Sequence, residues 1–205
     1  STGSTCELLY EIIIQMGYEK IINSRIASCL YLGIMTDTGS FQYSNVSHRT
    51  HEIVSKLISN EINQSEIHNK VYNDSSISRL KVLGSALNNL HQIKELNTAY
   101  MFLKREDLKE FDFKKGDSEG IVNYGLSLKN IIFSVIFIED MEDMNKVKIS
   151  FRSQGNFSCN EFANDNFKGG GHINAAGGIH YGQIEETINK FKKVINKYKN
   201  KLTNN

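Results

Sequence analysis

The spacing of apolar residues changes along this chain, and that change constrains the fold more than any other feature. Up to about residue 90, apolar residues recur every three or four positions, as they do on one face of a helix. Beyond that point, apolar runs of strand length such as 131–138 and 147–151 alternate with helical stretches. The sequence therefore predicts an α/β (α+β) protein, with a helical N-terminal part and a C-terminal domain that contains a sheet.

Three helices are expected before residue 60. The first begins at Ser4, where Glu7 completes the pattern of a capping box. Its apolar face, which we expect to be buried, consists of Leu8, Leu9, Ile12, Ile13 and Met16. The polar stretch 61–77 is the best candidate for a linker. We therefore expect one domain at residues 1–60 and a second at residues 78–205.

The charge of the chain limits the kinds of partner it can bind, and its cysteine content indicates the redox state of its cellular compartment. Lys and Arg number 24 and Asp and Glu number 23, so the net charge is +1. Coating long nucleic acid needs a strongly basic surface, whereas a short oligonucleotide or small anion needs only one local site. No stretch approaches the roughly 20 apolar residues of a membrane span. The three cysteines are far apart and form no CxxC pair, which favours a reducing, cytoplasmic location and no zinc site.

One acidic residue lies where a helix is expected to end, in the run Thr36-Asp37-Thr38-Gly39. A carboxylate there meets the negative end of the helix dipole, at a cost of about 0.3 kcal/mol or more. A bound divalent cation would reverse that sign, and Thr36 and Thr38 are candidates to orient the carboxylate. From spacing alone, a surface aspartate in a turn closed by Gly39 is the simpler interpretation. One carboxylate by itself does not make a metal site.

A glycine-rich run is the second candidate: five of the ten residues from 169 to 178 are glycine. Each glycine costs about 0.5–1 kcal/mol relative to alanine, so such a run favours a place where the backbone approaches a ligand closely. Exposed N–H groups in a turn can bind an anion, and His172 can donate to a phosphate or a base. The alternative is a flexible hairpin loop. The run matches neither the phosphate-loop nor the dinucleotide-binding pattern.

Two further residues could belong to the same site. Arg152 follows a predicted strand, and its planar guanidinium suits bidentate phosphate binding, although alone it would be read as a surface arginine. Asn123, in the run Glu119-Gly120-Ile121-Val122-Asn123, could contact a base edge or a sugar. Among the other histidines, His48 and His51 are three residues apart on a predicted helix, which is a weak metal-ligand signal. Most of these histidines are expected to be structural, His51 least clearly so.

In this order, the runs TDTG, EGIVN, FRS and GGGHINAAGG resemble the DHH phosphoesterase family with its C-terminal DHH-associated domain. The closest likeness is to the bacterial nanoRNase and 3′-phosphoadenosine 5′-phosphate phosphatase group (NrnA type). The resemblance implies the rear helical part of a DHH catalytic domain followed by a complete mixed-sheet associated domain. The Asp-His-His motif that names the family is absent, so the resemblance also implies a piece of a longer enzyme, inactive by itself.

The resemblance also implies roles for individual residues. Asp37 would be the catalytic metal ligand of this chain. It would hold one of two divalent ions or bridge both, and these ions, Mn²⁺ or alternatively Mg²⁺, would activate a water for attack on phosphorus. The substrate would be held by Arg152, Gly170, Gly171, His172 and, more weakly, Asn123. The implied substrates are short RNA or DNA oligonucleotides cleaved from an end, or 3′-phosphoadenosine 5′-phosphate. No membrane partner is expected, and the helices within residues 4–34 could supply a homodimer interface.

Three other functions stay open at this point. A phosphodiesterase of the same superfamily acting on cyclic or linear dinucleotides would use the same residues. A processive single-strand exonuclease should show a broader basic groove. The associated domain also occurs as a non-catalytic RNA-binding module in alanyl-tRNA synthetases, but such a module would not need the TDTG segment.

Overall fold

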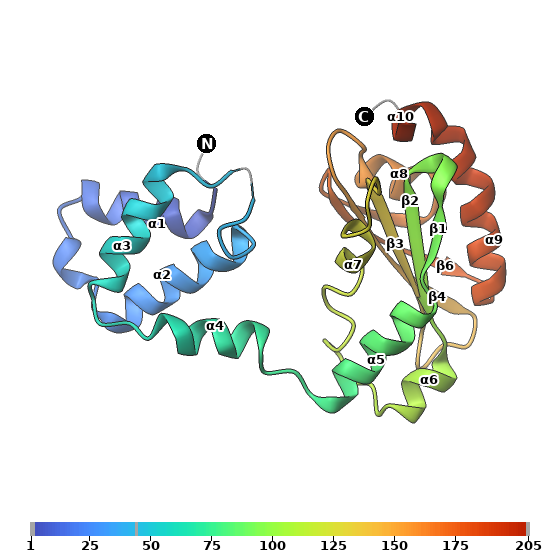
Figure 1. The fold of residues 1–205 in the computed structure, drawn as a ribbon, viewed down its shortest axis with the longest axis horizontal. Helices are drawn as coiled ribbons and strands as arrows, with labels where there is room; N and C mark the ends of the chain where they lie inside the picture. Colours follow the sequence, from blue (N-terminus) through green and yellow to red (C-terminus); the bar gives the residue numbers. More distant parts are fainter. Residues whose placement is uncertain (1–2, 44, 204–205) are drawn as a thin grey trace. The chain divides into compact units, whose positions relative to one another are not determined.

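The computed structural model describes residues 3–43 and 45–203. It forms two compact units, Ser1–Ser75 (unit 1) and Ser76–Asn205 (unit 2), each of which is described by itself (Figure 1). None of the helices in the described ranges has both the length and the apolar character that a membrane span requires.

Unit 1 is helical. Its elements are α1 (Thr5–Gln15), the short 3₁₀ helix η1 (Glu19–Ile21), α2 (Ser24–Asp37), α3 (His48–Ile58) and α4 (Gln64–Tyr72). Residues from α1, α2 and α3 form the core, among them Tyr10, Leu30, Ile34, Met35, Ile53 and Leu57. Ile67 of α4 packs against this core. Unit 1 therefore includes most of the polar stretch that the sequence assigned to a linker.

Helix α1 differs from expectation in two ways. Ser4 does cap it, accepting a 3.1 Å hydrogen bond from the Cys6 N–H. Glu7 does not close a capping box, because its buried carboxylate accepts bonds from the Gly3 N–H and the Thr50 hydroxyl instead. Ile13 of the expected apolar face packs against the core, but the burial expected for the other four residues is wrong, because α1 packs on unit 1 through the side that carries Tyr10. The exposed side carries Leu8 (47%), Leu9 (47%), Ile12 (42%) and Met16 (61%).

Unit 2 contains a six-stranded sheet in the order β1-β2-β3-β4-β6-β5. Its elements are α5 (Ile77–Asn88), β1 (His91–Ile93), η2 (Lys94–Leu96), β2 (Thr98–Leu103), α6 (Arg105–Glu110), α7 (Asn123–Leu126), β3 (Phe133–Glu139), β4 (Lys146–Ser153), α8 (Cys159–Asn166), β5 (Lys168–Gly171), β6 (Ala175–Tyr181), α9 (Ile184–Ile195), η3 (Asn196–Tyr198) and α10 (Lys199–Thr203). Strands β2 and β3 are parallel, and the other neighbouring pairs are antiparallel. The α/β class expected from the sequence is confirmed.

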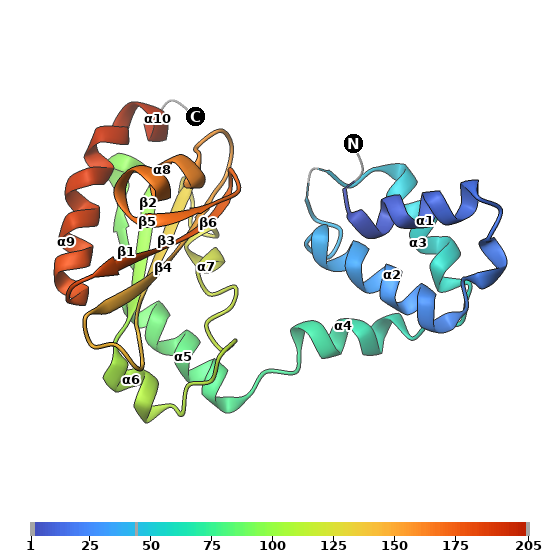
Figure 2. The same cartoon turned by 180° about the vertical axis from the view of Figure 1, so that it is seen from behind.

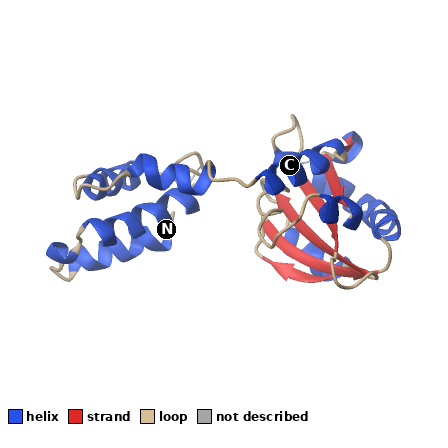
Figure 3. Cartoon of the chain, turned by 90° about the horizontal axis from the view of Figure 1, so that it is seen from below, coloured by secondary structure: helices blue, strands red, loops and turns tan. Residues whose placement is uncertain are grey.

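Helices cover both faces of the sheet (Figures 2 and 3). One face packs against α8, α9 and α10 around a buried aromatic cluster that includes Phe133, Phe151, Phe162 and Phe191. The other face packs against α5, α6 and the segment that leads into α7. Side chains alternate along β4, so Phe151 points into the aromatic cluster while Arg152 lies on the opposite face. This alternation places Arg152 outside the main core.

Candidate functional site

The glycine-rich run forms two paired strands, where the sequence predicted a turn that approaches a ligand, with a flexible hairpin loop as the alternative. Strands β5 and β6 are antiparallel, with Gly170 opposite Gly177. A Cβ atom on Gly169 would overlap the carbonyl oxygen of Gly177, so the two strands approach as closely as glycine permits. Gly171 has φ +154°, a conformation that other residues rarely adopt. The glycines therefore serve backbone packing within this hairpin.

The tip of the hairpin carries His172. The His172 N–H donates a 2.7 Å bond to the Ala175 carbonyl and closes the turn. The His172 side chain is exposed. Asn174 anchors the tip to the end of β4, because its amide donates to the Ser153 hydroxyl at 3.0 Å and to the Gly155 carbonyl at 3.1 Å. The turn is therefore fixed against the residues that follow Arg152.

Arg152 lies directly beside this hairpin. It is the register partner of Ala175 on β6 and of Ser134 on β3. Its side chain is half-buried, and Nη1 donates a 2.9 Å bond to the carbonyl of Phe151. The structure thus places Arg152 and the Gly170–His172 segment at the same end of the sheet, with β6 between their strands. That these residues form one binding site stays a prediction.

Asn123 lies over the same face of the sheet. It is the first residue of α7 and is exposed. The Ser134 hydroxyl donates a 2.7 Å bond to the Val122 carbonyl, and a Cβ atom on Gly125 would overlap the Ser134 side chain. Since Ser134 is the register partner of Arg152, the turn that carries Asn123 packs next to the arginine.

Sequence reasoning missed Asn160. This residue lies in the first turn of α8, and its Oδ1 accepts a 2.8 Å bond from the Gly171 N–H and a 3.1 Å bond from the Asn164 amide. The bond satisfies a backbone donor at the end of edge strand β5. No local pattern marks Asn160, because its partner is eleven residues away and α8 itself was not predicted.

Asp37 lies in unit 1, at the end of α2, and is exposed. Its Oδ2 accepts a 2.6 Å hydrogen bond from the Ser4 hydroxyl. The expectation that Thr36 and Thr38 orient this carboxylate is wrong, because both hydroxyls donate to carbonyls of α2 instead. Ser4 was singled out in the sequence only as a helix cap. Its role beside Asp37 arises from the packing of α1 on α2.

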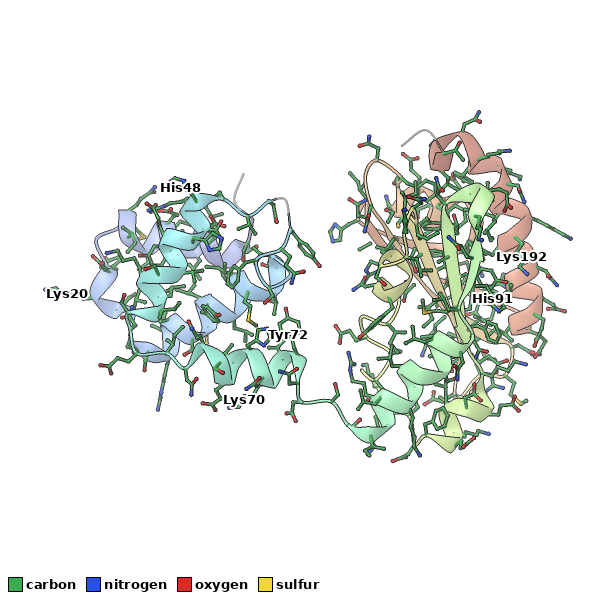
Figure 4. All side chains as sticks on the ribbon, viewed as in Figure 1. Lys20, His48, Lys70, Tyr72, His91 and Lys192 are labelled. Atoms are coloured by element: carbon green, nitrogen blue, oxygen red, sulfur yellow. The ribbon has the colours of Figure 1, made fainter. Side chains whose placement is uncertain are left out.

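The residues described here do not make a metal centre by themselves. Within residues 3–43 and 45–203, no group of three or more His, Cys, Asp or Glu side chains is placed to hold an ion. His48 of α3 and His91 of β1 both lie at the surface (Figure 4). Asp37 offers one carboxylate, whereas hard divalent cations take several oxygen ligands. Asp37 is in unit 1 and the five predicted substrate-binding residues are in unit 2, so their convergence in one site stays a prediction.

Comparison with known proteins identifies the family. The DHHA1 domain profile matches residues 95–201, about half of the chain, which therefore belongs to the DHHA1 domain family. The resemblance to DHH-family phosphoesterases of the NrnA type is confirmed. The chain is 28% identical over 183 residues to the bifunctional oligoribonuclease and PAP phosphatase NrnA of Bacillus subtilis, covering 88% of this chain and 56% of that protein.

Two other relatives support the same assignment. The NrnA of Mycoplasma pneumoniae is 30% identical over 153 residues, which cover 75% of this chain and 45% of that protein. A crystal structure of an exopolyphosphatase-related protein from Bacteroides fragilis superposes with a TM-score of 0.93 at 44% identity, over 98% of this chain and 58% of the other. The chain thus spans about half the length of the relatives that it matches.

Proposed function

We propose that this chain forms the substrate-binding domain and the rear of the catalytic domain of a phosphoesterase. Its substrates would be short oligonucleotides cleaved from an end, or 3′-phosphoadenosine 5′-phosphate. The observation that carries the proposal is the placement of Arg152 beside the β5–β6 hairpin, within the region that matches the DHHA1 family. The names of the NrnA relatives support this substrate class.

The residues of unit 2 suit a terminal phosphate. A guanidinium has five N–H donors, and among the residues that the structure describes Arg152 uses one of them, in the bond to the Phe151 carbonyl. The His172 imidazole is exposed on a turn that Asn174 holds in place. Charged donors fixed in this way would bind and orient a phosphate rather than react with it. The net charge of +1 agrees with substrates of a few nucleotides.

Two observations favour a hydrolase over an isolated RNA-binding module. The alignment with the Bacillus subtilis protein is longer than unit 2, so the similarity extends into unit 1. The exposed apolar side of α1, with Leu8, Leu9, Ile12 and Met16, suits a helix that packs against further structure. Both support the assignment of unit 1 to a DHH catalytic domain. A homodimer contact through this region and a cytoplasmic location stay predictions.

Asp37 is the metal ligand that we propose for this chain. A two-metal centre needs more ligands than the single carboxylate of Asp37 offers. We expect the other ligands to come from the part of the relatives' length that this chain does not span. The residues of this chain would therefore bind and orient the substrate, while Mn²⁺ and a two-metal attack by water stay predictions.

The test is equilibrium binding of fluorescent di- and trinucleotide RNA and of 3′-phosphoadenosine 5′-phosphate to residues 1–205. We expect Arg152→Ala and His172→Ala each to weaken binding about tenfold, with Lys129→Ala as a control at an exposed site on unit 2. Binding that is absent, or equal in all three variants, would contradict the proposal. A cyclic dinucleotide that binds better than the linear ones would favour a cyclic-dinucleotide phosphodiesterase.

Hydrolysis gives a separate test. With Mn²⁺ present, residues 1–205 are expected to bind these ligands but not to turn them over. Robust turnover would show that the metal-ligating residues of this chain suffice. It would contradict the proposal that the other metal ligands come from the part of the relatives that this chain does not span.

A further inference from the structure

An open pocket lies at the far end of strand β5 from His172. Its volume is about 440 Å³, and it is lined by the end of α8, the start of β5, the end of β6 and one residue of α9. The lining residues used below are Asn164, Phe167, Lys168, His180, Tyr181 and Lys190. The predicted phosphate site at Arg152 and His172 shares none of them.

Two ammonium groups meet two aromatic rings in this pocket. Lys168 Nζ lies 5.1 Å from the centroid of the Tyr181 ring, and Lys190 Nζ lies 4.9 Å from that of Phe167. Phe167 is buried, but Tyr181 is 55% exposed. Within the described part of the chain, neither ammonium forms an ion pair with a carboxylate at 4.0 Å or less. One ammonium therefore lies over an exposed aromatic ring and the other over a buried one, and neither is neutralised by a carboxylate within 4.0 Å among the described residues.

The remaining polar groups of the pocket are held in place. His180 Nδ1 lies 2.9 Å from the Thr187 hydroxyl, which donates to the Gln183 carbonyl. Thr187 thus accepts from Nδ1–H, which leaves Nε2 as the acceptor of the neutral ring. Burial, together with the charge of Lys190, lowers the pKa of His180 and favours that neutral form. Asp165, the acidic residue of the lining, accepts a bond from the Tyr198 hydroxyl.

Strand β5 and two asparagine side chains of α8 extend from the pocket to the glycine-rich hairpin. Strand β5 runs from Lys168 at the pocket to Gly171, next to His172. Helix α8 lies alongside, with Asn164 at the pocket end and Asn160 bonded to the Gly171 N–H. At about 3.3 Å per residue, Lys168 and His172 are separated by about 13 Å of strand. That distance exceeds the size of one nucleotide.

We propose that this pocket binds a nucleotide beyond the first two of a single-stranded oligonucleotide, with the base stacked on Tyr181 and its phosphate between Lys168 and Lys190. The proposal rests on the proposed function, because it extends the substrate from the terminal phosphate along β5. A stacking surface combined with lysines is the usual means of binding single strands without sequence preference. The pocket would therefore select for chain length rather than for base identity.

The test compares a pentanucleotide with a dinucleotide, both 5′-fluorescein-labelled RNA, by fluorescence anisotropy with residues 1–205. The variant Lys168→Gln/Lys190→Gln should weaken pentanucleotide binding at least tenfold and dinucleotide binding less than twofold. It should also reduce the salt slope for the pentanucleotide by about 1.4, the value for two lost phosphate contacts on a single strand. Tyr181→Leu should weaken pentanucleotide binding about tenfold.

Lys192→Gln is the matched control. Lys192, labelled in Figure 4, is also on α9 and also lies over an aromatic ring, 5.2 Å from the centroid of Tyr100, but it is outside the pocket. Unchanged thermal unfolding would show that the variants are folded. If the pocket variants leave pentanucleotide binding intact, or if Lys192→Gln has the same effect, the pocket proposal is wrong while the proposed function stands. If the unaltered chain binds neither RNA, both are wrong.

Discussion

The Ser4 hydroxyl donates a 2.6 Å hydrogen bond to the carboxylate of Asp37 and so joins the start of α1 to the last residue of α2. Ser4 is 5% exposed, whereas Asp37 is exposed. The bond fixes one carboxylate oxygen and leaves the group at the surface of unit 1. A carboxylate held in this way is prepared to contact a partner without first losing rotational freedom.

This bond should be measurable as a coupling energy. We expect Ser4→Ala to destabilise the chain by about 1 kcal/mol, since it also removes a helix cap. In a double-mutant cycle with Asp37→Ala, which removes the acceptor, the coupling should be about 1 kcal/mol. Urea unfolding of the single and double variants measures it. Ser76→Ala removes the cap of α5 in unit 2, so its coupling to Asp37→Ala should be near zero. Equal couplings would contradict the prediction.

Two glycines of the hairpin should respond differently to alanine. In Gly169→Ala the new methyl group would overlap the backbone of β6, and we expect a loss of about 1–3 kcal/mol in unfolding free energy. In Gly177→Ala the nearest atom is the Ile149 carbonyl oxygen at 3.6 Å, so the change should stay within about 0.5 kcal/mol. Thermal unfolding of both variants checks this, and equal losses would show that strand pairing does not depend on the close approach.

Asp140 should make unit 2 sensitive to acid. Its carboxylate, 7% exposed, lies 2.8 Å from Lys148 Nζ and accepts bonds from the Asp143 and Glu142 N–H groups. The Lys148 bond and these N–H groups hold the pKa of Asp140 well below its usual range. A lowered folded-state pKa stabilises the protein above the unfolded value of about 3.9, and that stabilisation is lost as the pH falls below it.

Asp140→Asn keeps an acceptor for the two N–H groups but loses the ion pair. We therefore expect it to lower the urea midpoint at pH 7 and to have a smaller effect at pH 3. Asp112→Asn is the control, because the Asp112 side chain is 86% exposed although it also pairs with a lysine. An Asp140→Asn effect that is equally large at pH 3 and pH 7 would exclude the carboxylate as its cause.

Cys159 should resist thiol reagents in the folded chain. It is fully buried, and burial raises the pKa of its thiol to about 11, although the Ser153 hydroxyl and Arg152 oppose the rise. Since the thiolate is the reactive form, maleimide at pH 8 should modify the exposed Cys29 more than about a hundredfold faster. Mass spectrometry of labelled peptides measures both rates. The difference should vanish in denaturant, and rapid labelling of Cys159 without denaturant would contradict the burial.

The local signals in the sequence located most helices and the longer strands, because apolar periodicity reflects which side of an element is buried. The likeness of the motifs predicted Arg152 and His172 in one site; the register places Arg152 opposite Ala175, near the turn that carries His172, and their shared role stays a prediction. The strands within the glycine-rich run were missed because glycine has low strand propensity, and pairing with β6 decides their structure.

Long-range contacts account for the other differences. Ser4 reaches Asp37 across 33 residues, and Asn160 reaches Gly171 across eleven, so no spacing rule marks either bond. The exposure of Leu8 and Met16 on α1 likewise depends on which side of the helix the rest of unit 1 packs against. A periodic apolar face shows that a helix can be buried, but it does not show which neighbouring structure covers that face.

The parallel pairing of β2 with β3 has a consequence for folding kinetics. Hairpins β3–β4 and β5–β6 close over short turns, whereas β2 meets β3 only after the segment from Lys104 to Ile132 has closed into a loop. Loop closure over a longer segment costs more entropy and is slower. The docking of β2 is therefore expected to limit the refolding rate of unit 2, so contacts between β2 and β3 should be partly formed in the transition state, after β3, β4 and β6 have paired.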